Sequence, residues 1–275
     1  MYVKAIGGGA MNENAPIGLF DSGIGGLTVV KEIQKLLPNE NIIYVGDNKR
    51  APYGPRSPIQ IVEFMHEILR FFVKKKVKMA VFACNTMTAY GYEEAKRQYP
   101  FLVTAMNTGV KQALDNSSNK KIGVIATQGA IASGMHEKAA LAMDVKAKVY
   151  AKACHEFVPL IEQGKVTGNE ITSVAHKYLQ PLKDSNIQSL ILGCTHYPII
   201  SEVIQEILGA DIKLINPAEA TAADAVMMLD EQQLRRTDFA ESITEIYFSA
   251  HLEQSKKMAE IILNNKKAVY ELVEL

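Results

Sequence analysis

The sequence predicts a layered α/β fold with a largely parallel sheet, and two observations indicate it. Short apolar runs alternate along the chain with longer amphipathic segments, the usual pattern of strands and helices in such folds. A weak internal echo also relates two halves of the chain, because IGLFDSG resembles IGVIATQG and MAVFACNT resembles LILGCTH.

The strands and helices follow from the apolar pattern. Residues 27–37 and 59–73 place apolar side chains at helical spacing, and such helices should cover a largely parallel sheet. In open α/β sheets, ligands bind beyond the carboxyl ends of the strands, where Cys84 and Cys194 stand. Six short apolar runs are the expected strands: 17–20, 41–46, 79–83, 121–126, 148–153 and 189–193.

The composition is that of an ordinary globular protein. Of 275 residues, 48% are hydrophobic and 22% charged, and the length fits one large domain or two. Basic and acidic residues are equal at 30 each, so we expect neither nucleic acid nor a membrane as a partner. Three cysteines do not make a disulfide framework and predict reduced thiols in the cytoplasm.

The first residues are set apart from the fold. They lack the basic start and apolar core of a signal peptide, and no apolar run in the chain is long enough to cross a bilayer. Met11 could serve as an alternative start, so we expect residues 1–15 to be a flexible extension.

Two matching segments carry the candidate chemistry, namely ACNT at residues 83–86 and GCTH at residues 193–196. A thiol at the start of a helix has a lowered pKa, which favours the thiolate. Polar side chains and backbone amides beside each cysteine could bind a carboxylate. A free cysteine is more often a small buried hydrophobe, but two in matching positions favour a functional pair.

The Gly-rich segment DSGIGG at residues 21–26 follows a strand and precedes a helix. It fits neither the dinucleotide fingerprint nor the P-loop, so the nucleotide interpretation is weak. Asp21 keeps two interpretations: a carboxylate that helps a neighbouring cysteine move protons, or a cap of the following helix.

Local pattern gives the remaining candidates ordinary structural explanations. Residues 50–54 read as a turn, and Glu162 reads as a solvated helix carboxylate. Zinc is set aside, because the cysteines and histidines show neither a CxxC nor an HExxH pair. The histidines expected at the surface or as helix caps are His66, His136, His155, His176 and His251.

DSGIGGLTV, ACNT, FVPLIEQG and ILGCTHYP, in this order, resemble the signature segments of bacterial glutamate racemases in the aspartate/glutamate racemase superfamily. The resemblance runs from about residue 17 to the end of the chain. It implies two similar α/β domains across a cleft that holds the active site: residues 1–107 with 217–275, and residues 108–216. It also implies a homodimer that racemises glutamate without a cofactor or metal and supplies D-glutamate for peptidoglycan synthesis.

The resemblance further implies roles for matching positions. Cys84 and Cys194 would be the two catalytic thiols, on opposite faces of the α-carbon. Asp21 would assist Cys84, and His196 with Glu162 would assist Cys194. The positions that would bind the amino acid are Ser22, Pro52, Tyr53, Gly54, Asn85, Thr86, Thr127 and Thr195.

Some positions depart from the pattern of these racemases. Asn107 and Thr108 stand where Glu-Pro is usual, Ala130 stands where Thr is common near the substrate, and Asn48-Lys49 replaces Thr-Ala. These departures question substrate preference more than reaction type. A racemase of aspartate or another amino acid and a non-catalytic ligand-binding paralogue stay open; a cysteine hydrolase built on Cys194 would leave Cys84 unexplained.

Overall fold

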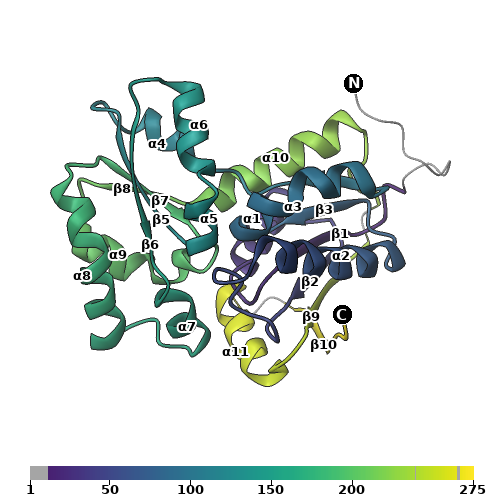
Figure 1. The fold of residues 1–275 in the computed structure, drawn as a ribbon. Helices are drawn as coiled ribbons and strands as arrows, with labels where there is room; N and C mark the ends of the chain where they lie inside the picture. Colours follow the sequence, from purple (N-terminus) through teal and green to yellow (C-terminus); the bar gives the residue numbers. More distant parts are fainter. Residues whose placement is uncertain (1–11, 239, 265–266) are drawn as a thin grey trace.

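The computed structural model describes residues 12–238, 240–264 and 267–275, and its strands form two separate sheets (Figure 1). The flexible extension expected at residues 1–15 lies outside the described residues as far as residue 11. Residues 12–15 form a turn, in which the Ala15 amide donates to the Asn12 carbonyl at 3.0 Å. No described helix has the length and apolar character needed to span a membrane.

The first sheet has six strands in the order β10-β9-β2-β1-β3-β4, so it joins the two ends of the chain. Every pairing within it is parallel among the described residues. Its strands are β1 (Ile17–Asp21), β2 (Ile42–Gly46), β3 (Met79–Phe82), β4 (Leu102–Thr104), β9 (Thr244–Phe248) and β10 (Val269–Leu272).

The second sheet has four strands in the order β6-β5-β7-β8, and its described pairings are also parallel. Its strands are β5 (Lys121–Ala126), β6 (Lys148–Ala153), β7 (Ser189–Gly193) and β8 (Lys213–Ile215). The pair β5–β7 occupies the place in this sheet that β1–β3 occupies in the other, which is the relationship that the internal echo suggests.

Helices separate the strands and cover the sheets (Figure 1). Two of them, α4 and α10, lead the chain from the first sheet to the second and back, and α10 packs against α1. They are α1 (Leu27–Leu36), α2 (Pro58–Lys74), α3 (Asn85–Gln98), α4 (Val110–Asp115), α5 (Gln128–Ala132), α6 (Met135–Met143), α7 (Phe157–Glu162), α8 (Asn169–Asp184), the 3₁₀ helix η1 (Tyr197–Ile200), α9 (Ser201–Leu208), α10 (Pro217–Glu231) and α11 (Leu252–Ile262).

The expected fold class is confirmed: the protein is α/β with parallel sheets. All six expected strands and both expected helices are present, with ends within one residue of the expected ones. Strands β1, β2, β3 and β7 are buried along their whole length, as strands covered by helices on both faces must be. The domain boundaries after residues 107 and 216 stay a prediction.

Candidate functional site

Two buried thiols lie beyond the ends of equivalent strands. Cys84 follows β3 and caps the start of α3, and Cys194 directly follows β7. Each side chain is almost fully buried, at 5% and 6% exposure. Both line one small cavity at the carboxyl ends of the strands, the position at which open α/β sheets bind ligands.

This cavity brings together every site residue expected from the sequence except Glu162, and it adds Val158. Its volume is about 20 Å³, which is room for roughly one water. The lining residues are Asp21, Ser22, Pro52, Tyr53, Gly54, Cys84, Asn85, Thr86, Thr127, Val158, Cys194, Thr195 and His196.

Asp21 binds the backbone of the Gly-rich turn, and its role in moving protons stays a prediction. Its carboxylate accepts the backbone amides of Ser22 at 2.7 Å and Gly26 at 2.6 Å, which fixes the turn before α1. The same carboxylate lies beside Cys84. Burial raises the pKa of the Cys84 thiol well above its usual value, and Asp21 raises it further, against an opposite effect of the Met87 amide. The Cys84 thiol is therefore held in its protonated form.

Cys194, His196 and Glu162 form a chain of contacts. The His196 ring lies with Nδ1 3.8 Å from Cys194 Sγ and Nε2 2.7 Å from Glu162 Oε1. Burial lowers the pKa of His196, but the contacts with Cys194 and Glu162 outweigh burial and raise that pKa well above 6.5. A protonated imidazole that donates to sulfur stabilises a thiolate.

Glu162 is more than the solvated carboxylate that local pattern indicates. It ends α7, its side chain is 23% exposed, and its Oε1 also accepts the Ile24 amide at 3.1 Å. The Glu162 side chain thus joins His196 to the Gly-rich turn before α1. No periodicity or spacing around Glu162 predicts these contacts. Only the resemblance to bacterial glutamate racemases points to Glu162 as a site residue.

Asn85 is the clearest unpaired polar group of the cavity. It is 2% exposed, and neither its amide nitrogen nor its amide oxygen has a partner among the described residues. It begins α3, where free backbone amides favour an anion. Beside it, the hydroxyls of Thr86 and Thr127 share a hydrogen bond of 2.7 Å across the cleft. These groups are suited to a small polar ligand that carries a carboxylate.

The departing positions lie outside this cavity. Asn107 donates from its side chain to Asp224 at 2.8 Å, and Thr108 and Ala130 do not line the cavity. Ala130 lies in α5, one turn beyond Thr127, and its amide donates to the Thr127 hydroxyl at 3.3 Å. Ala130 is therefore connected to the cavity through Thr127, which lines it.

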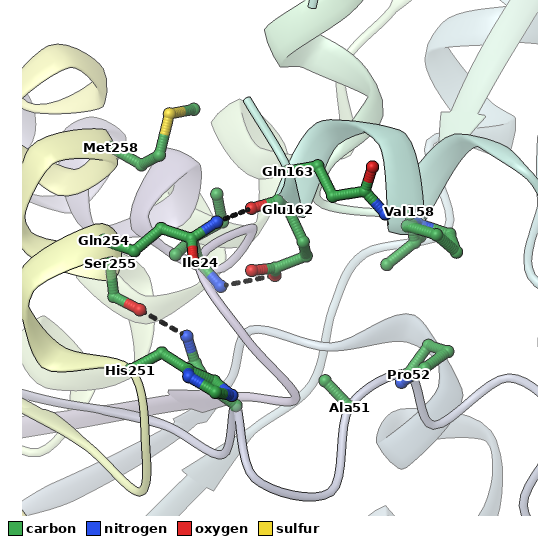
Figure 2. Close-up of a pocket in the computed structure, with 12 residues that line it drawn as sticks. Ile24, Ala51, Pro52, Val158, Glu162, Gln163, His251, Gln254, Ser255 and Met258 are labelled. Carbon is green, nitrogen blue, oxygen red and sulfur yellow. Dashed lines mark hydrogen bonds between the residues drawn. The ribbon is translucent and has the colours of Figure 1, made fainter. Parts of the chain in front are cut away.

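A second pocket of about 280 Å³ opens beside the first and shares Pro52 and Val158 with it. Figure 2 shows Glu162 on one side of this pocket and Gln254 of α11 on the other, joined where Gln254 Nε2 donates to the Glu162 carbonyl at 2.8 Å. Asn48 lines the same pocket, so this departure from the usual motif lies at the approach to the cavity.

The other chemistry-bearing side chains have separate places. His136 is buried at 3% exposure, which corrects the expectation of a surface or capping residue: it packs behind Gly193, just before Cys194. Cys154 is buried just after β6. Over the described ranges, no group of three or more His, Cys, Asp or Glu is arranged to hold a metal ion.

Comparison with known proteins identifies the family. Residues 17–225 match the family described as Asp/Glu/Hydantoin racemase. A glutamate racemase of Lysinibacillus sphaericus is 43% identical, over 78% of this chain and 82% of that protein. The crystal structure of a Bacillus anthracis glutamate racemase has a TM-score of 0.87 and 33% identity, over 96% of this chain and 99% of that one.

A glutamate racemase of Francisella tularensis, solved in complex with D-glutamate, has a TM-score of 0.86 and 36% identity. That comparison covers 95% of this chain and 98% of the other. The family match covers residues 17–225, the structural matches cover 95–96% of the chain, and the chain belongs to the Asp/Glu/Hydantoin racemase family.

Proposed function

We propose that this protein interconverts L- and D-glutamate, with Cys84 and Cys194 as the two acid/base groups and no cofactor. The observation that carries the proposal is the pairing of two buried thiols at the ends of equivalent strands, in one cavity beside the unpaired amide of Asn85. The similar proteins named glutamate racemase support glutamate as the substrate.

Racemisation moves one proton off the α-carbon and another onto its opposite face. The thiolate on one face takes the α-proton and becomes a thiol, while the thiol on the other face gives its proton to the carbanion and becomes a thiolate. Burial beside Asp21 supports Cys84 as a thiol, and the His196 imidazole, whose pKa is raised well above its usual value, lies against the Cys194 sulfur. In this proposal Cys194 begins a turnover as the base and Cys84 as the acid, and one turnover reverses these roles.

Asp21 and Glu162 assist the two proton transfers in this proposal. Asp21 lies beside Cys84 and raises the pKa of that thiol. Glu162 holds His196 through Nε2, so that Nδ1 faces the Cys194 sulfur at 3.8 Å. The imidazole can then hydrogen-bond to the Cys194 sulfur as that sulfur gains and loses a proton in each turnover.

The amino acid itself is held by the polar residues of the cavity. The α-proton is weakly acidic while the carboxylate is ionised, so donors placed around that carboxylate must stabilise the carbanion. The α3 amides and the Asn85 side chain supply such donors on one side. Thr86 and Thr127 share one hydrogen bond, which leaves one of their two hydroxyl protons for the ligand, and Thr195 lines the same cavity. Ser22 and the segment 52–54 complete the site.

The cellular role follows from the same proposal. D-Glutamate is a component of peptidoglycan, so we place the enzyme in cell-wall synthesis, in the cytoplasm and as a homodimer, as its resemblance to bacterial glutamate racemases implies. The free thiols Cys84, Cys154 and Cys194 accord with a reducing compartment.

Circular dichroism of the purified protein, without added cofactor, tests the proposal. We expect the signals of L-glutamate and of D-glutamate to decay to zero, and those of both aspartates to persist. Decay with aspartate alone would make the protein an aspartate racemase. No decay with any of the four would favour the non-catalytic paralogue.

A further inference from the structure

Asp47 is a buried carboxylate that the proposed mechanism leaves without a role. It directly follows β2, its side chain is fully buried at 0% exposure, and its amide donates to the Asp21 carbonyl at 3.0 Å. Burying a charge is costly unless the charge is paired and hydrogen-bonded. The partners of Asp47 therefore indicate what it does.

The Asp47 carboxylate is bound from several directions. Its Oδ2 accepts Arg50 Nε at 2.5 Å and the Tyr53 hydroxyl, and its Oδ1 accepts Ser249 Oγ at 2.7 Å. The Ser249 oxygen in turn accepts the Lys49 amide at 2.9 Å. The carboxylate thus joins the segment after β2 to the residue that follows β9.

Tyr53 connects this cluster to the cavity. Its ring is 1% exposed and lies 5.4 Å from the Phe64 ring, over which the Arg50 guanidinium sits at 4.1 Å. A phenol donates one hydrogen, and Asp47 accepts it. Burial raises the pKa of Tyr53, and Asp47 raises it further, so the phenol stays protonated and remains a donor.

The segment held in this way is part of the proposed binding site. Residues 52–54 line the cavity, and Gly54 approaches the other half of the protein so closely that a Cβ there would lie 3.2 Å from Thr127 Cβ. A misplacement of about 1 Å in such a segment can cost roughly 100-fold in activity. The position in which Tyr53 is held therefore affects how residues 52–54 contact the ligand.

We infer that Asp47 is a positioning residue, which acts through the Tyr53 hydroxyl to fix residues 52–54 against Thr127, with Ser249 completing the clamp. This inference rests on the proposed function, because it takes residues 52–54 to bind the amino acid. It assigns Asp47 to substrate binding and leaves proton transfer to the thiols. KM should therefore respond more strongly than kcat.

A double-mutant cycle of Asp47→Asn and Tyr53→Phe tests the inference. Each single change weakens a hydrogen bond to a buried charge, so we expect KM for both enantiomers of glutamate to rise about tenfold, with kcat within about threefold of wild type. Since Asp47 acts through Tyr53, the double variant should be no worse than Tyr53→Phe alone. Unchanged KM in the single variants, or fully additive effects on KM, would overturn the inference.

Ser249→Ala and a matched control keep the test decisive. Ser249→Ala should raise KM in the same direction, and Ser242→Ala should not, because Ser242 lies before the other end of β9 and donates to the Pro38 carbonyl at 3.0 Å. If Asp47→Asn fails to fold, Tyr53→Phe and Ser249→Ala carry the test, and unchanged KM in both overturns it.

Calorimetric titration of wild type with D-glutamate separates the two proposals. Wild type that neither binds nor turns over glutamate would overturn both. Wild-type turnover with unchanged KM in Asp47→Asn and Tyr53→Phe would overturn the positioning role alone.

Discussion

The Thr195 hydroxyl donates to the Asp21 carboxylate at 3.0 Å, across 174 residues of sequence. Thr195 follows Cys194, and Asp21 lies beside Cys84, so this contact joins the surroundings of the two thiols. The Asp21 carboxylate also accepts two backbone amides, from Ser22 and Gly26. The halves of the site are therefore linked through one buried charge.

Thr195→Val removes that link. A buried hydrogen bond to a charged group contributes about 1.5–3 kcal/mol, so we expect kcat/KM for glutamate to fall by about 10- to 100-fold. Thr167→Val, at an exposed position, is the control and should leave kcat/KM unchanged. Wild-type kinetics in Thr195→Val would show that the contact is dispensable.

The two thiols should be needed together. We expect Cys84→Ala and Cys194→Ala each to reduce racemisation by at least about 100-fold, because each removes a proton donor or acceptor on one face of the substrate. Cys154→Ala, which changes the third buried thiol, should keep racemase activity. A single-cysteine variant at either site that still racemises at the wild-type rate would refute the two-thiol proposal.

Asn85→Ala should separate stability from binding. Both amide atoms of Asn85 are buried without a partner in the described chain, and unpaired buried polar atoms cost about 1–3 kcal/mol. We expect the Tm of the unliganded protein to stay the same or rise, while KM rises at least about tenfold. Thermal unfolding and steady-state kinetics measure both; a large loss of Tm with unchanged KM would make Asn85 a purely structural residue.

Much of this site could be predicted from the sequence, since its residues occur in short segments next to strand ends. The segments ACNT and GCTH predict both thiols of the cavity and their polar neighbours. Asp47 lies in the same segment as residues 52–54, in GDNKRAPYG. An acidic residue between a strand and a binding segment is the sequence feature that points to Asp47. Its partner Ser249 could not be found, because the pairing spans 202 residues.

The missed strands have a physical reason. Strand β8 has three residues with an exposed start, and β10 is a largely exposed strand at the sheet edge, so neither forms a buried apolar run. Strand β9, TEIYF, has a polar start that hides its pairing with β2. The burial of His136 has no local signal, because its neighbour Gly193 lies 57 residues further along the chain.

His136 should make the protein sensitive to acid. Burial lowers the pKa of His136 to about 4. The unfolded chain binds this proton near pH 6.5 and the folded one near 4, so stability is complete above about 6.5 and declines as pH falls between these values. The decline amounts to about 3 kcal/mol at most. Urea unfolding at several pH values should show a smaller loss in His136→Leu than in wild type or in His176→Leu, which changes an exposed histidine; parallel profiles would contradict the assignment.

The Lys78–Glu40 ion pair should be costly to break from one side. Nζ lies 2.6 Å from Oε2, with the two side chains 0% and 3% exposed. We expect Lys78→Met to lower the free energy of unfolding by about 3–5 kcal/mol, because it leaves the buried Glu40 charge without its cation, held only by the Arg236 amide at 2.9 Å. Lys78→Met with Glu40→Leu should recover most of that loss. A double variant as unstable as the single one would mean that the charge on Glu40 is not the cause.

The most direct test of the central claim is deuterium incorporation during the first turnovers of L-glutamate in D₂O, followed by NMR of both enantiomers. With thiols on opposite faces, the group that takes the α-proton differs from the group that delivers one, and the delivering thiol carries solvent deuterium. We predict D-glutamate that is deuterated at the α-carbon, while the remaining L-glutamate keeps its proton. D-Glutamate that retains the original proton would mean that a single group moves it, and would contradict the account.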